Sequence, residues 1–136
     1  MKIVVDANRI IAALIKSGTT RDILLSEDFD FASPEFVLRE IDKYQDYIKN
    51  KTGLGLEEFE LLLSIIFEHI LIIPKEDYKE FMDNSKNLTE DSKDIPYLAV
   101  CNLIKADGIW SHDPDFLLQT KYKVFTNIDL IKKINP

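Results

Sequence analysis

Six carboxylates of this 136-residue chain share one kind of position, either where an apolar segment ends or in the first turns of a helical pattern. They are Asp6, Glu40, Asp91, Asp94, Asp113 and Asp115. A carboxylate beside an apolar core loses hydration, and several carboxylates at one place repel each other unless a cation neutralises them. The pattern therefore predicts a divalent-metal site, with either Asp91 or Asp94 as one of its ligands. Phosphodiester hydrolysis is the leading chemistry for such a site.

The oxygen-rich set of candidate ligands favours Mg²⁺ or Mn²⁺ over zinc. These ions prefer carboxylate and water oxygens and leave coordination positions open for a phosphate. The chain offers only His69, His112 and Cys101 as nitrogen or sulfur ligands, which do not make a zinc set. A bound ion lowers the pKa of a coordinated water, a carboxylate can accept the proton, and the cation stabilises the charge on the phosphorane and the departing oxygen.

Strand and helix patterns alternate along the sequence that must position these residues. Short apolar or β-branched runs predict five strands, at residues 2–6, 29–32, 70–73, 109–111 and 123–125. Helical patterns cover residues 10–17, 20–26, 34–51, 56–68, 75–87, 92–105 and 127–134. This rhythm predicts an α/β fold, a single-domain three-layer sandwich over residues 1–136 with a mostly parallel five-stranded sheet and helices on both faces.

Several residues indicate where the helices begin. Ser33 is typical of an N-cap and Pro34 of a first helical position. Pro96 is tolerated only in a first turn, so its helix begins within residues 92–95 and carries Asp94 at its N-terminal end. Asn127 is expected to cap the last helix. The segment 56–68 is apolar nearly all round, which predicts a buried helix.

Topology explains why distant carboxylates are expected to meet. In open α/β sheets, ligands bind beyond the carboxyl ends of the strands, at the point where the strand order reverses. Asp6 ends the first predicted strand, and Asp113 lies at the tip of the fourth. If those strands are neighbours, their tips lie about 5 Å apart, so both carboxylates can share one cation.

The composition excludes several classes of protein. No apolar run reaches the roughly 20 residues that span a bilayer, and one cysteine excludes an internal disulfide, so we expect a cytoplasmic protein without a membrane anchor. The net charge of −7 argues against a protein that holds nucleic acid mainly by a basic surface. Bound cations can offset that charge, so a nuclease stays compatible with it.

Four segments resemble, in the same order, the motifs of the PIN domain, a metal-dependent ribonuclease fold that includes VapC-type toxins of prokaryotic toxin–antitoxin pairs. They are Val4-Val5-Asp6-Ala7-Asn8, Ser33-Pro34-Glu35 through Leu38-Arg39-Glu40-Ile41, Asp94-Ile95-Pro96-Tyr97-Leu98-Ala99, and Trp110-Ser111-His112-Asp113-Pro114-Asp115-Phe116. No single motif is specific, but their order and spacing cover nearly the whole chain.

The resemblance implies roles for the matching residues. Asp6, Glu40, Asp94 and Asp113 would be the catalytic, metal-binding quartet. Asp115 would be a further ligand or would hold a water, and Asn8 and Ser111 would orient carboxylates or water, with Asp91 as the alternative to Asp94. Such domains usually form homodimers and act on RNA, and toxin members pair with a small antitoxin protein. Arg9 stands where an apolar residue is more common and is a candidate contact for phosphate.

Each of these acids also has a structural explanation. A cap at Asp91 or Asp94 would contribute about 1 kcal/mol to helix stability. Glu40 beside Arg39 and Lys43 is typical of a solvated helix face. Asp113-Pro114-Asp115 is typical of a turn, and His112 is expected to point away from Asp113 and to be peripheral.

Three functions are therefore compared. The first is a Mg²⁺- or Mn²⁺-dependent endoribonuclease, plausibly the toxin of a toxin–antitoxin pair. The second is a catalytically silent PIN-like module that binds RNA or a protein. The third is a phosphatase or phosphotransferase, which would need a second Asp where Asn8 stands. Retention of the whole quartet favours the nuclease.

Overall fold

The protein is built on a sheet of five strands that all run parallel. The computed structural model describes residues 1–134. The strand order is β3-β2-β1-β4-β5. The strands are β1 (Lys2–Val5), β2 (Asp30–Pro34), β3 (Ile70–Ile73), β4 (Gly108–Trp110) and β5 (Val124–Phe125). This confirms the prediction of a mostly parallel five-stranded sheet, and the order reverses at β1 because β2 and β4 flank it.

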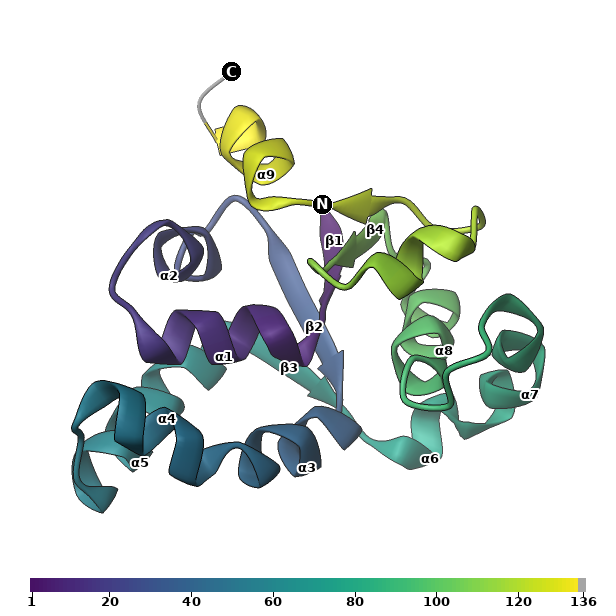
Figure 1. Ribbon diagram of the computed structural model, residues 1–136. Helices are drawn as coiled ribbons and strands as arrows, with labels where there is room; N and C mark the ends of the chain where they lie inside the picture. Colours follow the sequence, from purple (N-terminus) through teal and green to yellow (C-terminus); the bar gives the residue numbers. More distant parts are fainter. Residues whose placement is uncertain (135–136) are drawn as a thin grey trace.

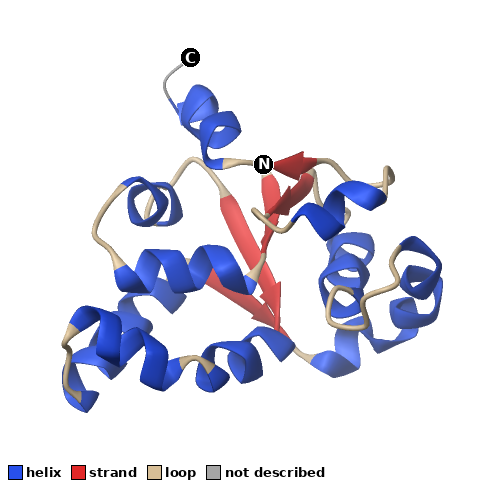
Figure 2. Cartoon of the chain, viewed as in Figure 1, coloured by secondary structure: helices blue, strands red, loops and turns tan. Residues whose placement is uncertain are grey.

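Helices cover both faces of this sheet, which makes three layers (Figure 1). The α-helices are α1 (Ala7–Ile15), α2 (Thr19–Leu24), α3 (Phe36–Lys43), α4 (Gln45–Thr52), α5 (Leu56–Phe67), α6 (Lys75–Tyr78), α7 (Met82–Ser85), α8 (Ile95–Ile104) and α9 (Asn127–Ile134). Short 3₁₀ helices occupy Lys79–Phe81 (η1), Lys86–Leu88 (η2) and Pro114–Leu118 (η3). Helices α1 to α5 lie on one side of the strands, and α6 to α8 lie on the other (Figure 2).

The core is formed where β1 is enclosed between α1 and α8. Ile3, Val4 and Val5 have no exposed surface, as expected for a parallel strand covered on both faces. Helix α8 is buried along Ile95–Cys101, so it is the fully enclosed helix of the fold. The aromatic rings of Phe31 and Trp110 stack at 5.4 Å across the layer.

The prediction that segment 56–68 is a buried helix was wrong. Helix α5 buries Phe59 and Ile66, but Leu61 is 64% exposed and Leu56 and Ile65 are also exposed. The helix lies at the outside of its layer and packs on one side only, against α1 and β3. An apolar pattern all round a helix does not say which side meets a neighbour, so the sequence could not reveal this exposure.

The predicted helix start at Ser33 and Pro34 was also wrong. Both residues belong to β2, and α3 begins at Phe36. The buried hydroxyl of Ser33 donates a hydrogen bond to the Val5 carbonyl, 2.9 Å away, and therefore ties β2 to β1 instead of capping a helix. Pro34 is the last residue of its strand, a place where its missing N–H is tolerated.

Three further helix boundaries differ from the predicted ones. The segment expected at 34–51 divides at Tyr44 into α3 and α4. The segment expected at 75–87 consists of four short helices, and the Ser85 hydroxyl donates to the Phe81 carbonyl, a side-chain bond that competes with the regular helix. Thr126, not Asn127, caps α9: its hydroxyl accepts from the Asp129 amide at 3.3 Å, and the Asp129 carboxylate accepts from the Thr126 amide at 2.8 Å.

Candidate metal centre

The site is built at the carboxyl ends of the two adjacent strands β1 and β4. Asp6 follows β1 and precedes α1, and its amide donates to the Trp110 carbonyl at 3.0 Å. The Asp6 side chain is only 7% exposed. Ser111, the residue after β4, donates from its hydroxyl to Asp6 Oδ2 at 2.7 Å. The register of the sheet therefore fixes Asp6 beside the loop that carries the next two carboxylates.

That loop is folded around the Ser111 hydroxyl. Ser111 Oγ accepts a hydrogen bond from the Asp113 amide at 2.9 Å, and Asp113 Oδ1 accepts one from the Asp115 amide, also at 2.9 Å. Asp113 caps η3, which Pro114 begins. Asn8 Nδ2 lies 3.4 Å from Ser111 Oγ. Hydrogen bonds thus link Asn8 to Ser111 and Ser111 to Asp6, and the orienting role expected for Asn8 and Ser111 stays a prediction.

A second group of carboxylates comes from the segment before α8. Ligand oxygens of Asp91, Asp94 and Asp115 lie within 4.8 Å of one another, and within residues 1–134 this is the only such group of three. The Thr89 hydroxyl donates to Asp94 Oδ2 at 3.3 Å and accepts from the Asp91 amide at 3.2 Å. Asp94 is 4% exposed. Asp91 and Asp94 thus both lie near Asp115, so both are candidate metal ligands.

Glu40 lies on α3 and contacts α8, the helix that begins after Asp94. Its Oε1 accepts a hydrogen bond from the hydroxyl of Tyr97, which projects from α8. Burial raises the pKa of Glu40, while Lys93 and Lys43 act to lower it and Asp91 to raise it. Because the charge of Asp91 acts on Glu40, we group Glu40 with the carboxylates before α8.

The six carboxylates Asp6, Glu40, Asp91, Asp94, Asp113 and Asp115 are called the acidic cluster below, and burial raises the pKa of three of them, Asp6, Glu40 and Asp94. Burial, followed by Glu40 and Asp113, raises the pKa of Asp6 to about 6 despite its bond to Ser111. Burial, followed by Asp91, Asp113 and Asp6, raises the pKa of Asp94 to about 7. The ionised cluster is therefore costly without a counter-charge, and a divalent cation would supply one.

The donor set fits a hard cation. Every candidate ligand is a carboxylate, and no sulfur or imidazole lies in the group of three, which is the chemistry that Mg²⁺ and Mn²⁺ accept. Asp6, Glu40 and Asp113 are not part of that compact group. The hydrogen bond from the Asp115 amide to Asp113 Oδ1 links the compact group to Asp113, and Ser111 links Asp113 to Asp6.

Arg9 and His112 border the acidic cluster on the side of α9. Arg9 Nε donates to Asn8 Oδ1 at 3.0 Å, and its Nη1 lies 3.5 Å from Asn127 Oδ1. Burial lowers the pKa of the Arg9 guanidinium, while Asp6 acts to raise it. Burial and Arg9 lower the pKa of His112, whose Nε2 accepts from the Asn127 amide at 3.4 Å.

Three residues of the site were missed in the sequence. Thr89 precedes Asp91 by two residues, a spacing typical of a side-chain turn, so a signal existed. Tyr97 follows Asp94 by three residues, one helical turn, and could also have been found. Asn127 gave no local signal, because its partners Arg9 and Trp110 come from distant segments.

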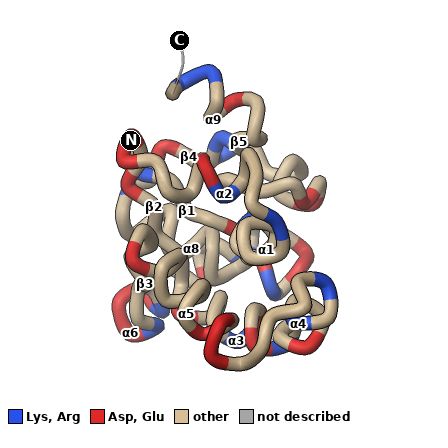
Figure 3. Tube along the Cα trace, turned by 90° about the vertical axis from the view of Figure 1, so that its left-hand side faces the viewer, with Lys and Arg blue, Asp and Glu red and all other residues tan. Residues whose placement is uncertain are grey.

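In the backbone view of Figure 3, Lys and Arg positions are dispersed among Asp and Glu positions. Within residues 1–134, no helix is long and apolar enough to span a bilayer.

Comparisons with known proteins agree with this architecture. No curated protein sequence matches the chain significantly. A family model described as the PIN domain matches residues 4–131, a range that contains the whole acidic cluster. The chain therefore belongs to the PIN domain family, whose members are in general metal-dependent nucleases.

Proposed function

We propose that this PIN domain is an endoribonuclease that uses Mg²⁺ or Mn²⁺. The observation that carries the proposal is the burial of Asp6 and Asp94 among other carboxylates, which raises their pKa values to about 6 and about 7. A protein gains no stability from ionised carboxylates packed in this way. The arrangement is explained by a cation that the carboxylates hold.

In this proposal the residues of the acidic cluster have different roles. Asp91, Asp94 and Asp115 would hold the cation, and Asp6, Glu40 and Asp113 would complete the site near a substrate phosphate. A bound cation would lower the pKa of a coordinated water and neutralise charge on the phosphate. Ser111 holds Asp6 and the Asp113 backbone in place, and Tyr97 fixes Glu40. A cluster carboxylate accepts the proton of the attacking water.

Cleavage of a panel of labelled RNAs tests this function. Wild-type protein should cut RNA with Mg²⁺ or Mn²⁺ and not with EDTA, and Asp6→Asn should reduce cleavage at least about a hundredfold. Asp83→Asn is the matched control, because Asp83 is an exposed acid paired with Lys86 outside the acidic cluster. Cleavage that survives Asp6→Asn, or that proceeds in EDTA, would refute the proposal.

A role as the toxin of a toxin–antitoxin pair is the finer form of this proposal. The exposed apolar side chains of Tyr44, which joins α3 to α4, of Tyr47 in α4 and of Leu61 in α5 are available to a second copy in a homodimer or to an antitoxin. Growth arrest on expression, relieved by the product of an adjacent short reading frame, would support the toxin. A cytoplasmic RNA-processing enzyme would cause no such arrest.

A further inference from the structure

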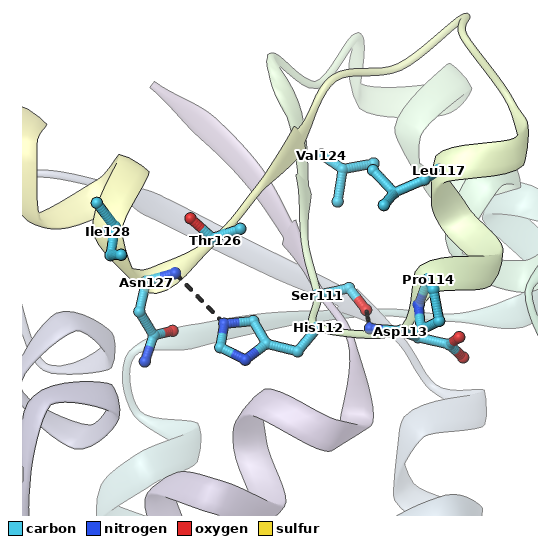
Figure 4. Close-up of a pocket in the computed structure, with 9 residues that line it drawn as sticks. All are labelled: Ser111, His112, Asp113, Pro114, Leu117, Val124, Thr126, Asn127 and Ile128. Carbon is cyan, nitrogen blue, oxygen red and sulfur yellow. Dashed lines mark hydrogen bonds between the residues drawn. The ribbon is translucent and has the colours of Figure 1, made fainter.

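A pocket of about 350 Å³ opens directly beside the acidic cluster. It lies between the loop after β4, the 3₁₀ helix η3, the strand β5 and the start of α9 (Figure 4). Its lining residues include Asp113, which belongs to the acidic cluster, so the pocket and the cluster are continuous. The pocket therefore lies within reach of a polymer bound at the cluster.

Two large apolar side chains form opposite walls. Leu117 from η3 is 66% exposed and Ile128 from α9 is 64% exposed, and Val124 of β5 completes the apolar lining. Figure 4 shows Leu117 and Val124 side by side across the pocket from Ile128. Exposed apolar walls that rim a hollow next to a reaction site are typical of a ligand-binding surface.

The polar groups of the pocket are nearly all occupied. Asn127 Oδ1 accepts from Trp110 Nε1 at 2.9 Å, and Asn127 Nδ2 donates to Thr20 Oγ1 at 2.8 Å. Thr126 is engaged with Asp129. His112 accepts at Nε2 from the Asn127 amide, so its ring carries a proton at Nδ1, for which residues 1–134 provide no acceptor. Hydrogen bonds within the protein thus already engage most of the polar groups beside the apolar walls.

One positive charge lies between the acidic cluster and the pocket. Arg9 bonds to Asn8 on the cluster side and to Asn127 on the pocket side, and both acceptors are neutral amides. No carboxylate forms an ion pair with Arg9 within the described residues 1–134. Its guanidinium has five N–H donors and uses two, so it keeps both charge and donors for an anion.

We propose that the pocket holds one nucleobase of the RNA strand, next to the phosphate bound at the acidic cluster, with Arg9 on the connecting phosphate. This inference rests on the proposed nuclease function and adds a substrate subsite to it. The apolar walls suit the face of a base, and the unpaired cation suits a phosphodiester. An apolar peptide would use the walls but would leave Arg9 without an anionic partner.

The subsite should discriminate little among the four bases. A hydrophobic pocket separates ligands only weakly by shape, whereas strong selectivity needs several hydrogen-bonding groups that the wrong ligand leaves unpaired. Here hydrogen bonds within the protein already engage Asn127, Thr126 and Nε2 of His112, so few side-chain groups are left to distinguish bases. Affinities for the four nucleotides should therefore agree within about tenfold.

Methyl NMR of the full chain tests the subsite without any need for catalysis. Nucleoside 5′-monophosphates, added with Mg²⁺, should shift the methyl signals of Leu117, Val124 and Ile128, and ribose 5-phosphate should not. Equal shifts with ribose 5-phosphate, or no shifts at all, would overturn the subsite. A response to an apolar helical peptide, with none to the nucleotides, would overturn it in favour of a protein partner.

Neighbouring leucines provide a matched kinetic test. Leu117→Ala combined with Ile128→Ala should raise KM for RNA about threefold to tenfold and leave kcat nearly unchanged. Leu118→Ala should change neither constant, because Leu118 is 77% exposed on the same 3₁₀ helix but does not line the pocket. A rise in KM for Leu118→Ala equal to that of the double variant would contradict the subsite. Absence of cleavage by the wild type would refute the nuclease instead, and the NMR result would still decide the pocket.

Discussion

The hydroxyl group of Ser111 links Asp6, which follows β1, to the loop that follows β4. It donates to Asp6 and accepts from the Asp113 amide, so the carboxylate after β1 and the loop after β4 share one anchor. The importance of Asp6 could be predicted from its place at the end of an apolar strand. The joint anchoring could not, because it depends on the parallel pairing of β1 with β4.

Ser111→Ala tests this anchor. Loss of the hydroxyl removes a donor from a buried carboxylate, so affinity for Mn²⁺ should fall about tenfold to a hundredfold, and cleavage should fall with it. Isothermal titration calorimetry measures the affinity, and Ser26→Ala, at a partly buried serine that bonds to Asp28 outside the acidic cluster, is the control. Unchanged Mn²⁺ affinity in Ser111→Ala would show that the hydroxyl does not position the site.

The raised pKa of Asp94 gives a second prediction at this scale. In the folded protein Asp94 binds its proton up to a pKa of about 7, against an ordinary value of 3.8, so the folded state loses stability as pH rises between those values. Asp94→Asn should therefore stabilise the metal-free protein by about 1–2 kcal/mol above pH 7, and the gain should vanish near pH 4. Urea unfolding in EDTA at several pH values measures the difference.

Asp83→Asn serves as the control for that measurement, since Asp83 is an exposed acid in a different helix. A gain of equal size at pH 4 and pH 8 would contradict the assignment of the effect to the ionisation of Asp94.

At the scale of elements, the strands were predicted well and the helix starts less well. Apolar runs locate all five strands because a parallel strand is buried on both faces. Ser33 and Pro34 looked like a helix start, yet Ser33 satisfies its hydroxyl on the Val5 carbonyl of a neighbouring strand. A tertiary hydrogen bond of this kind overrides local preference and leaves no trace in sequence spacing.

Gly108 provides an element-scale prediction because β4 and β5 approach closely there. A Cβ at this position would lie 2.5 Å from the Lys123 carbonyl oxygen and 2.5 Å from the Phe125 ring. Gly108→Ala should push the strands apart and lower the free energy of unfolding by about 2 kcal/mol or more. It should also weaken cleavage, because Ser111 follows the same strand.

Gly55→Ala is the matched control, since a Cβ there meets only the end of the Glu58 side chain at 3.6 Å. Its cost should stay below about 1 kcal/mol. Chemical denaturation of both variants decides the question, and similar losses would mean that the close approach of β4 and β5 is unimportant.

At the scale of the whole molecule, the repulsion among the carboxylates of the acidic cluster is expected to lower the stability of the metal-free protein. The chain carries a net charge of −7, and part of that charge is concentrated in the acidic cluster. The proximity of Asp6 to the loop that carries Asp113 could be predicted, because these residues follow the ends of the neighbouring strands β1 and β4. The approach of Asp91 and Asp94 to Asp115 and the pocket beside η3 could not be, because each brings together segments that are distant in the sequence.

Replacing EDTA by Mg²⁺ should therefore raise the melting temperature of the wild type by about 3–6 °C, since a ligand that binds only the folded state stabilises it. Asp94→Asn, which has already lost part of the repulsion and one ligand, should respond much less. Differential scanning fluorimetry measures both. Equal shifts in the two proteins would place the effective cation outside the acidic cluster.

The most direct test of the central claim is anomalous diffraction from a crystal that contains Mn²⁺. The account predicts an anomalous peak within bonding distance of Asp94, with Asp91, Asp115, Asp6 or Asp113 among the other ligands. The number of peaks there would also show whether one or two ions bind. Peaks confined to exposed acids elsewhere, with none in the acidic cluster at saturating Mn²⁺, would contradict the claim that these carboxylates form a metal centre.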